Sequence, residues 1–186
     1  MGRRAGCVAL IILLALSIGG ICAYAQGAGY IELWRSDRLP GWVRLVSWSP
    51  GGDKLLVLTT RKKAAVFSST GEVLWSVEGV DLASWSPDGS VIAMALGNKL
   101  ALFSSSGEKL WEVVTSDFYR FAGDIDDIDW SPSGDKLALA TLVPMVLSRD
   151  GELLWTGGEV NAAALDWSPD GDVLAVGGYG GVYAYS

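Results

Sequence analysis

The pentapeptide WSPDG occupies residues 85–89 and again residues 167–171, and the variants WSPGG and WSPSG begin at Trp48 and Trp130. The four tryptophans that open these segments are 37, 45 and 37 residues apart along the chain. Each is followed by an apolar run of similar length, so the repeat extends well beyond the pentapeptide. The pattern indicates that the chain builds one supersecondary unit four times.

Each unit contains the residues expected for four short strands joined by tight turns. In SPDG, proline presets φ at one turn position and glycine takes a position where a Cβ would clash. The next segments, such as residues 54–60 and 91–97, are nearly continuous apolar runs, which favours strands buried on both faces. A period near 40 residues with several strands per unit is typical of a β-propeller. We therefore predict an all-β fold, a β-propeller with four blades of four antiparallel strands.

The last unit lacks an obvious fourth strand, and the start of the chain offers a replacement. Residues 31–34 read IELW, which resembles the fourth-strand endings EVLW at residues 72–75 and ELLW at residues 152–155. We expect residues 29–36 to complete the last blade and close the ring, because an open array leaves a sheet face and a strand edge bare. Pairing of two chains into an eight-bladed assembly is the alternative, although a monomer is favoured.

The boundaries of the expected propeller follow from the repeat. The domain spans residues 26–186 and contains the closing strand. The blades are expected at about residues 42–78, 79–114, 124–158 and 161–186. Each of the first three blades begins shortly before a WSP tryptophan and ends shortly after the tryptophan of its fourth strand. The repeat thus accounts for nearly the whole domain.

Residues 1–25 lie outside the expected propeller. They consist of a short basic start, an apolar run expected to be helical, and the small residues AYA at positions 23–25, which suit cleavage by a signal peptidase. The uncharged run from residue 5 to residue 25 is also long enough for an uncleaved membrane anchor. Both interpretations place the domain outside the cytoplasm, either secreted or tethered to the membrane by this segment alone.

The composition excludes several classes of function. The chain contains no histidine, and its two cysteines, Cys7 and Cys22, both lie in the N-terminal segment. The domain therefore has no imidazole or thiolate metal ligand, no disulfide and no nucleophile–histidine–acid triad. The net charge of −7 disfavours a nucleic acid partner, because a phosphate backbone would be repelled. We expect neither a metal nor a cofactor.

An acidic run, GDIDDIDW, precedes the third WSP segment. Its acids are Asp124, Asp126, Asp127 and Asp129. Carboxylates can bind calcium or serve as a catalytic pair, but the spacing is not that of a calcium loop, and alternate strand residues point to opposite faces. Asp129 and Asp166 also fill the position before tryptophan that serine fills in the other repeats. We therefore expect Asp129 and Asp166 to bond local backbone.

The repeats resemble those of WD40-like and quinoprotein (PQQ)-like β-propellers over residues 30–186. WSPDG is similar to the turn after the first strand of WD40-like blades, and GExLW at residues 71–75 and 151–155 is similar to an outer-strand motif of quinoprotein-like repeats. The usual Gly-His and Trp-Asp pairs of WD40 blades are missing, so the histidine-centred network of that family is absent. The resemblance implies the fold, while propellers host many unrelated activities.

Departures from the repeat indicate where a partner would bind. Loops after the second and fourth strands are expected to open on one face, and three irregular segments fall there: residues 39–42, 61–63 and 115–123. The candidate partner-binding residues are Trp42, Arg61, Lys62, Lys63, Phe118, Tyr119, Arg120 and Phe121. Aromatic residues and arginine are enriched in binding hot spots. In the alternative interpretation, Phe118 and Phe121 cover the blade below and the basic cluster is a solvated turn.

The sequence thus predicts an exported or membrane-anchored propeller that binds another protein or peptide without catalysis. The composition provides no catalytic residue set, so we do not expect an enzyme. The alternative is an enzyme or cofactor-binding propeller, quinoprotein-like or acting on sugars, which would require acids converging in the central channel with raised pKa values.

Overall fold

The structure is a computed structural model of the chain and describes residues 31–36 and 39–186. It divides into two units, residues 1–32 and residues 33–186, and the strands of the described residues lie in the second unit. The predicted signal peptide or anchor and the first two residues of the predicted closing strand lie outside the described residues. Within the part that the structure describes, no helix is both long and apolar enough to cross a membrane.

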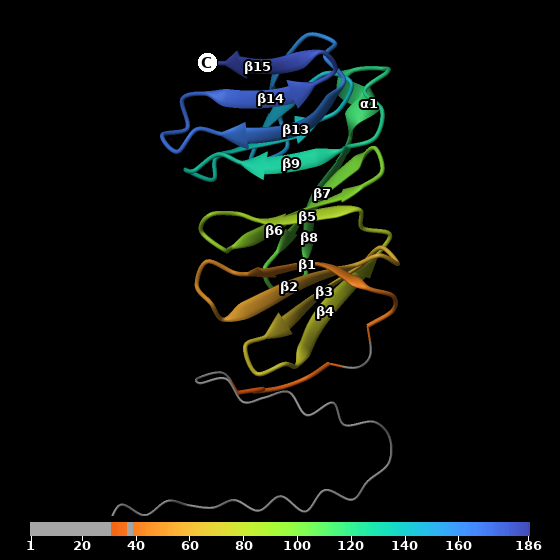
Figure 1. Ribbon diagram of the computed structural model, residues 1–186, viewed down its shortest axis with the longest axis vertical. Helices are drawn as coiled ribbons and strands as arrows, with labels where there is room; N and C mark the ends of the chain where they lie inside the picture. Colours follow the sequence, from red (N-terminus) through yellow and green to blue (C-terminus); the bar gives the residue numbers. More distant parts are fainter. Residues whose placement is uncertain (1–30, 37–38) are drawn as a thin grey trace, which may run out of the picture. The chain divides into compact units, whose positions relative to one another are not determined.

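Residues 33–186 form four antiparallel sheets that follow one another along the chain (Figure 1). Sheet A contains β1 (Val43–Trp48), β2 (Lys54–Thr59), β3 (Lys63–Ser68) and β4 (Val73–Glu78). Sheet B contains β5 (Leu82–Trp85), β6 (Val91–Leu96), β7 (Lys99–Ser104) and β8 (Lys109–Val114). Sheet C contains β9 (Asp127–Trp130), β10 (Lys136–Ala140), β11 (Met145–Ser148) and β12 (Leu153–Thr156). Sheet D contains β13 (Ala162–Trp167), β14 (Leu174–Gly178) and β15 (Gly181–Tyr185), and one short helix, α1 (Thr115–Phe118), lies between β8 and β9.

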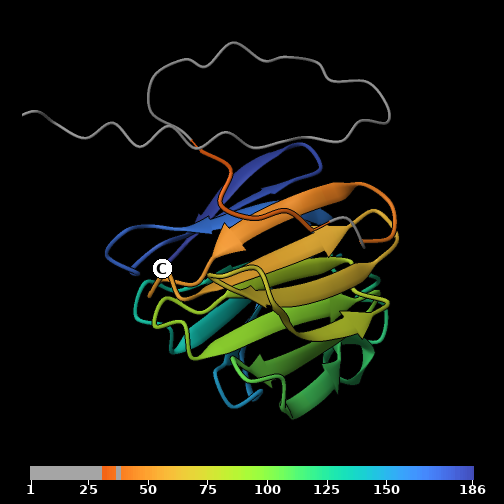
Figure 2. The same ribbon diagram turned by 90° about the horizontal axis from the view of Figure 1, so that it is seen from below.

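The sheets pack face to face in chain order, as Figures 1 and 2 show from two directions. Successive side chains of a strand point to opposite faces, so one strand supplies two cores. In β6, Ile92 packs toward sheet A and Val91 packs toward sheet C. Ala138 of β10 and Val176 of β14 meet in the core between sheets C and D. This arrangement confirms, for β2, β6 and β10, the prediction that the apolar second strands are buried on both faces.

Strand β14 departs from this pattern. Its residues alternate between buried and half-buried, whereas β2, β6 and β10 are buried almost throughout. Leu174 and Val176 face sheet C, so Ala175 and Gly177 point to the other face of sheet D. Among the described residues, no further sheet packs on that face. Sheet D is therefore one end of the series.

The WSPDG turns form as the sequence predicts, and the serine side chain of each turn hydrogen-bonds an aspartate. Gly89 has a φ of +68°, a conformation that favours glycine. The Ser86 hydroxyl donates to Asp88 Oδ1 at 2.6 Å. In the variants without aspartate at that position, an aspartate two residues later accepts the same bond: Ser49 Oγ donates to Asp53 at 2.8 Å and Ser131 Oγ to Asp135 at 2.9 Å. The variant turns thus keep the hydrogen bond between serine and aspartate, although the aspartate lies two residues later in the sequence.

The tryptophans of the fourth strands join neighbouring sheets. Trp75 of β4 stacks on Phe103 of sheet B with ring centroids 5.8 Å apart, and its indole N–H donates to the Ser105 carbonyl at 3.2 Å. Trp111 of β8 donates likewise to the Arg149 carbonyl of sheet C at 2.9 Å. Each of these tryptophans therefore links the outer strand of its own sheet to the next sheet, at the turn that follows the third strand of that sheet.

The N-terminal segment has the contacts of a fourth strand but not its pairing. Trp34 stacks on Phe67 with centroids 5.9 Å apart and donates its indole N–H to the Ser69 carbonyl at 3.1 Å, as Trp75 does one sheet further on. Residues 33–36 form no strand, and sheet D has three strands rather than four. The predicted pairing of this segment with the last blade is therefore not formed among the described residues. Trp34 binds sheet A, while no strand of the described residues pairs with the outer edge of β15.

Candidate binding face

The antiparallel order of the sheets sorts their connections onto two faces. The WSP turns and the turns after the third strands lie on one face, because both follow strands that run in the same direction. The connections after the second and fourth strands lie on the opposite face, which we call the loop face. Binding residues of propeller-like scaffolds concentrate on such loops, since the sheets hold them rigidly.

A polar hollow of about 280 Å³ opens on the loop face. It is lined by Arg44, Lys62, Asp81, Leu82, Gly97, Asp124, Ile125 and Asp126. These residues come from sheets A and B and from the connection that leads into sheet C. Two cationic and three acidic side chains meet there, so the hollow can accept hydrogen-bond donors and acceptors from one ligand.

Lys62 is positioned by its backbone at one side of the hollow. It has a φ of +59°, and its N–H donates to the Thr59 carbonyl at 3.0 Å. Its ammonium group lies 2.7 Å from Asp81 Oδ1, and Asp81 Oδ2 accepts the Gly97 N–H at 3.1 Å. Through these two bonds, Asp81 links the β2–β3 loop to the β6–β7 loop. The link sets the distance between the two loops that border the hollow.

Trp42 directly precedes β1 on the loop face. Its backbone N–H donates to Thr60 Oγ1 at 3.1 Å, and its carbonyl accepts the Thr60 N–H at 2.8 Å. The backbone is thus held by the β2–β3 loop, whereas the indole is 83% exposed. A large aromatic side chain held on a fixed backbone loses little entropy on binding.

The long insertion after β8 forms the other side of the loop face. The Thr115 hydroxyl is buried and lies 3.2 Å from the Asn98 carbonyl and 3.1 Å from the Gly123 carbonyl, which closes the insertion on itself. Phe118 and Tyr119 pack against the core between sheets B and C. Phe121 is 66% exposed, and the Arg120 guanidinium lies 5.4 Å from the centroid of its ring.

The Tyr119 hydroxyl donates a hydrogen bond to Glu159, which precedes sheet D. This bond to the carboxylate, together with partial desolvation, raises the pKa of Tyr119 above its ordinary value. The neutral phenol is thereby favoured at all physiological pH values. Tyr119 serves as a bridge from the insertion to the last sheet rather than as an acid or base.

The structure divides the eight predicted site residues into two groups. Five are exposed on the loop face, namely Trp42, Arg61, Lys62, Arg120 and Phe121, and three are half-buried, namely Lys63, Phe118 and Tyr119. Lys63 is instead the first residue of β3 and pairs with Glu78 at 3.1 Å, and Phe118 is a core anchor, as the alternative interpretation expected.

Sequence reasoning missed two residues of the hollow, Arg44 and Asp81. Both had a signal, because Arg44 is the charged residue of the inner strand VRLVSW, and Asp81 occupies the same place four residues before its WSP tryptophan, as Asp126 does in the next repeat.

The acids of β9 have a structural role. Asp127 Oδ2 accepts the Leu165 N–H at 3.0 Å, and Asp129 Oδ2 accepts the Trp167 N–H at 2.9 Å. Asp129 interacts with the backbone of the adjacent Trp130, as predicted, but its 2.9 Å hydrogen bond runs to the next sheet, which was not predicted. Burial raises the pKa of Asp129, and the neighbouring acids add to this. Within residues 31–36 and 39–186, no three histidine, cysteine or acidic side chains are grouped so that they could hold a metal ion.

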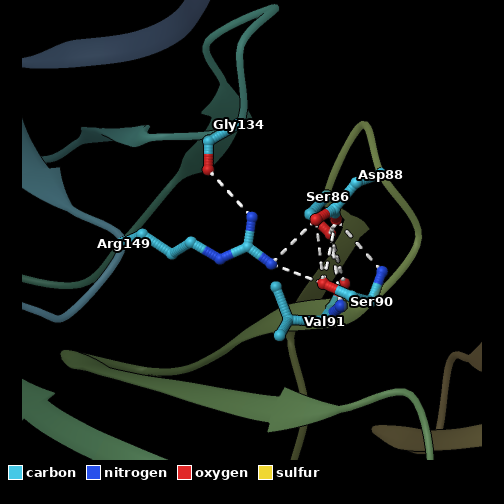
Figure 3. Close-up of polar contacts among 6 residues, drawn as sticks. All are labelled: Ser86, Asp88, Ser90, Val91, Gly134 and Arg149. Atoms are coloured by element: carbon cyan, nitrogen blue, oxygen red, sulfur yellow. Dashed lines mark hydrogen bonds and ion pairs between the residues drawn. The ribbon is translucent and has the colours of Figure 1, made fainter.

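A charged contact joins sheets B and C on the face opposite the loop face (Figure 3). The Arg149 guanidinium lies 3.1 Å from Asp88 Oδ2 and also donates to the Gly134 carbonyl at 3.3 Å and to the Ser90 hydroxyl. The hydrogen bond from Ser86, supported by Ser90 and Arg149, lowers the pKa of Asp88 far below its usual range. This face is thus held together by its own contacts.

Comparison with known proteins agrees with this architecture. Residues 151–183 match the family model described as WD domain, G-beta repeat. The structure is similar to the β-propeller domain of Cps50 (Swd1) from Myceliophteria thermophila, with a TM-score of 0.64 and 16% sequence identity. The match covers 76% of this chain and 52% of that domain, so the chain spans about half of the propeller it matches. The search of curated proteins gives no match.

These findings define the class of fold. The chain forms sheets of a β-propeller, and one of its repeats is similar to a WD40 repeat. At 16% identity the structural likeness establishes the fold alone. The quinoprotein-like part of the predicted resemblance finds no support in the comparisons.

Proposed function

We propose that this chain is a non-catalytic scaffold that binds another protein or a peptide through the loop face. The observation that carries the proposal is that two exposed aromatic side chains, Trp42 and Phe121, lie on the same face as a polar hollow lined by both charges. Apolar anchors beside a small set of oriented polar groups are the usual composition of a protein-binding hot spot.

The acids of the chain favour binding over catalysis. Asp127 and Asp129 hold the backbone of sheet D, and Asp81 is occupied by Lys62 and by the Gly97 N–H. Carboxylates engaged in this way position loops and strands. WD40-like propellers commonly serve as interaction scaffolds, which agrees with this assignment.

We also propose that the scaffold works outside the cytoplasm, either secreted or tethered by its N-terminal segment. The support is in the sequence: a basic start, an uncharged apolar run and small residues at positions 23–25. Fractionation of cells that produce the full chain, followed by N-terminal sequencing, tests this. Cleavage before Gln26 indicates a signal peptide, an intact chain in the membrane indicates an anchor, and an intact chain in the cytoplasm contradicts both.

Capture from membrane extracts with substituted chains tests the binding proposal. The full chain is immobilised in four forms: unchanged, Trp42→Ala, Phe121→Ala, and Val73→Ala as the control. Val73 is also an exposed apolar residue, 56% accessible, but it begins β4 near the opposite face. We expect one or more proteins to be retained by the unchanged and Val73→Ala chains and to be lost, by roughly tenfold or more, from the two loop-face variants. Equal retention by all four chains would contradict the proposal.

A further inference from the structure

The outer faces of the first and the last sheet both expose apolar side chains, and each face lacks the neighbour that the other could supply. On sheet A, Val46 and Trp48 of the inner strand are 59% and 51% exposed. The equivalent tryptophans Trp85 and Trp130, which face a preceding sheet, are 7% and 5% exposed. On sheet D, Val182 of β15 pairs with Gly177, so it lies on the outer face and is 79% exposed. Sheet A thus lacks a preceding sheet and sheet D lacks a following one among the described residues.

At two junctions, the residue before the WSP tryptophan of one sheet forms a hydrogen bond with the WSP tryptophan of the next sheet, although different atoms are used at each junction. From sheet C to sheet D, the Asp129 carboxylate accepts the Trp167 N–H at 2.9 Å. From sheet A to sheet B, the Trp85 indole donates to the Ser47 carbonyl at 3.2 Å. Ser47, Asp129 and Asp166 occupy the same place in their repeats, one residue before the WSP tryptophan.

Asp166 is therefore placed to bind a sheet that follows sheet D. It pairs with Ala175, which lies opposite the face that packs on sheet C, and it is exposed. By equivalence with Asp129, its carboxylate would accept the backbone N–H of a WSP tryptophan on the next sheet. Trp48 is the WSP tryptophan whose sheet has no predecessor.

The strand count of the two ends is also complementary. Sheet D supplies an inner, a second and a third strand and has no fourth. Beside sheet A, Trp34 already occupies the place of a fourth-strand tryptophan, on Phe67 and the Ser69 carbonyl. A three-stranded sheet D docked on sheet A would therefore form, together with residues 33–36, one complete blade.

We propose that a second copy of this chain supplies that docking partner, so that sheet D of each copy packs on sheet A of the other. The match covers 52% of a solved propeller domain, so two copies of this chain together have about the length of one propeller. Two copies related by a two-fold axis would close into one ring of eight sheets, within the range known for propellers. Each of the two junction blades would then combine three strands of one copy with residues 33–36 of the other.

Cross-linking between two differently tagged full chains tests the proposal. One chain carries Val46→Cys and the other carries Ala164→Cys, both with Cys7 and Cys22 replaced by serine. Residue 46 is equivalent to Leu165 and residue 164 to Asp127, which are in contact at the junction of sheets C and D through a 3.0 Å hydrogen bond. Both positions are exposed, so cysteine is tolerated there. A short thiol-specific cross-linker should give a covalent product that contains both tags.

The control replaces Val46→Cys by Leu110→Cys, an exposed residue of sheet B that lies at neither end of the series. We expect at least a tenfold lower yield of the two-tag product from this pair. As a second measurement, native mass spectrometry of the unsubstituted full chain in mild detergent should show two chains, and Asp166→Arg should shift it toward one chain while Asp150→Arg does not. A two-tag yield equal to that of the control, or a link formed only when both cysteines are in one chain, would overturn the proposal.

Discussion

Asp129 shows how one acidic side chain can serve the fold rather than a reaction. Its carboxylate lies half-buried at the inner edge of sheet C and accepts the backbone N–H of Trp167. Desolvation disfavours its charge, and Asp166 and Asp127 add repulsion, so its pKa is raised. The hydrogen bond stabilises the fold, whereas the charge opposes it.

Substitution of Asp129 separates these two effects. Asp129→Ala leaves the Trp167 N–H without its acceptor and should lower the free energy of unfolding by about 1–3 kcal/mol. Asp129→Asn keeps an acceptor oxygen and removes a charge that burial penalises, so its stability at pH 7 should equal or exceed that of the wild type. Urea unfolding followed by tryptophan fluorescence measures both. Equal destabilisation by the two variants would show that the charge itself is required.

Asp88 has the opposite electrostatic situation, and the sign of its pH dependence differs. Its pKa is lowered in the folded state by the Ser86 hydroxyl first, and by Ser90 and Arg149. Its contribution is therefore fully present above the unfolded pKa of about 3.9 and is lost as the pH falls through the folded value. Asp88→Asn should cost stability at pH 7 and progressively less below pH ~4.

Denaturant unfolding of the wild type and of Asp88→Asn across this pH range measures the difference. The control is Asp150→Asn, a turn residue of sheet C for which the difference should stay near zero. A difference for Asp88→Asn that does not change with pH would contradict the assigned role of its ionised form.

At the scale of elements, the turns after the third strands couple one sheet to the next. Gly107 has a φ of +96°, and a Cβ placed there would lie 2.7 Å from Cγ of Trp75. The turn therefore needs glycine for two reasons, the backbone conformation and the close approach of the indole. Gly71 has the same relation to Trp34, which supports the fourth-strand role of the N-terminal segment.

A pair of alanine substitutions distinguishes the two reasons. Gly180 has a φ of +86°, and a Cβ added there would meet no atom within 4 Å, so Gly180→Ala should cost only the backbone strain, about 1–2 kcal/mol. Gly107→Ala carries the same strain and must also displace Trp75, which should add about 1–3 kcal/mol. Thermal unfolding of both variants measures the difference. Equal losses would mean that Trp75 moves aside without cost.

The elements also show how far the sequence could predict the structure. The WSP repeat predicted the strands, the tight turns and the burial of the second strands, because each depends on local residue types. The absence of a fourth strand from the last unit was also predicted, whereas the position of the N-terminal segment on sheet A was not, since it depends on how the ends of the series meet. In the WSPGG and WSPSG turns, the use of Asp53 and Asp135 as acceptors could have been predicted from the sequence, because each directly follows the glycine of its turn.

At the scale of the whole molecule, the repeated residues form the four sheets. The residues that differ between repeats form the candidate binding site. The predicted partner-binding residues Trp42, Arg61, Arg120 and Phe121 are exposed on the loop face. The polar hollow on the same face was not predicted, because it combines single residues such as Arg44 and Asp81 from different sheets. The charged residues of the hollow form a binding site only in the folded chain, where several loops lie side by side.

The central claim is that the loop face, rather than the face of the WSP turns, contacts the partner. A photoactivatable amino acid introduced into the full chain in its native host tests this directly, at residues 61 and 120 on the loop face and at residues 72 and 170 on the opposite face. We predict that positions 61 and 120 cross-link to the same protein and that positions 72 and 170 give no such product. Cross-links from positions 72 and 170 alone would contradict the account.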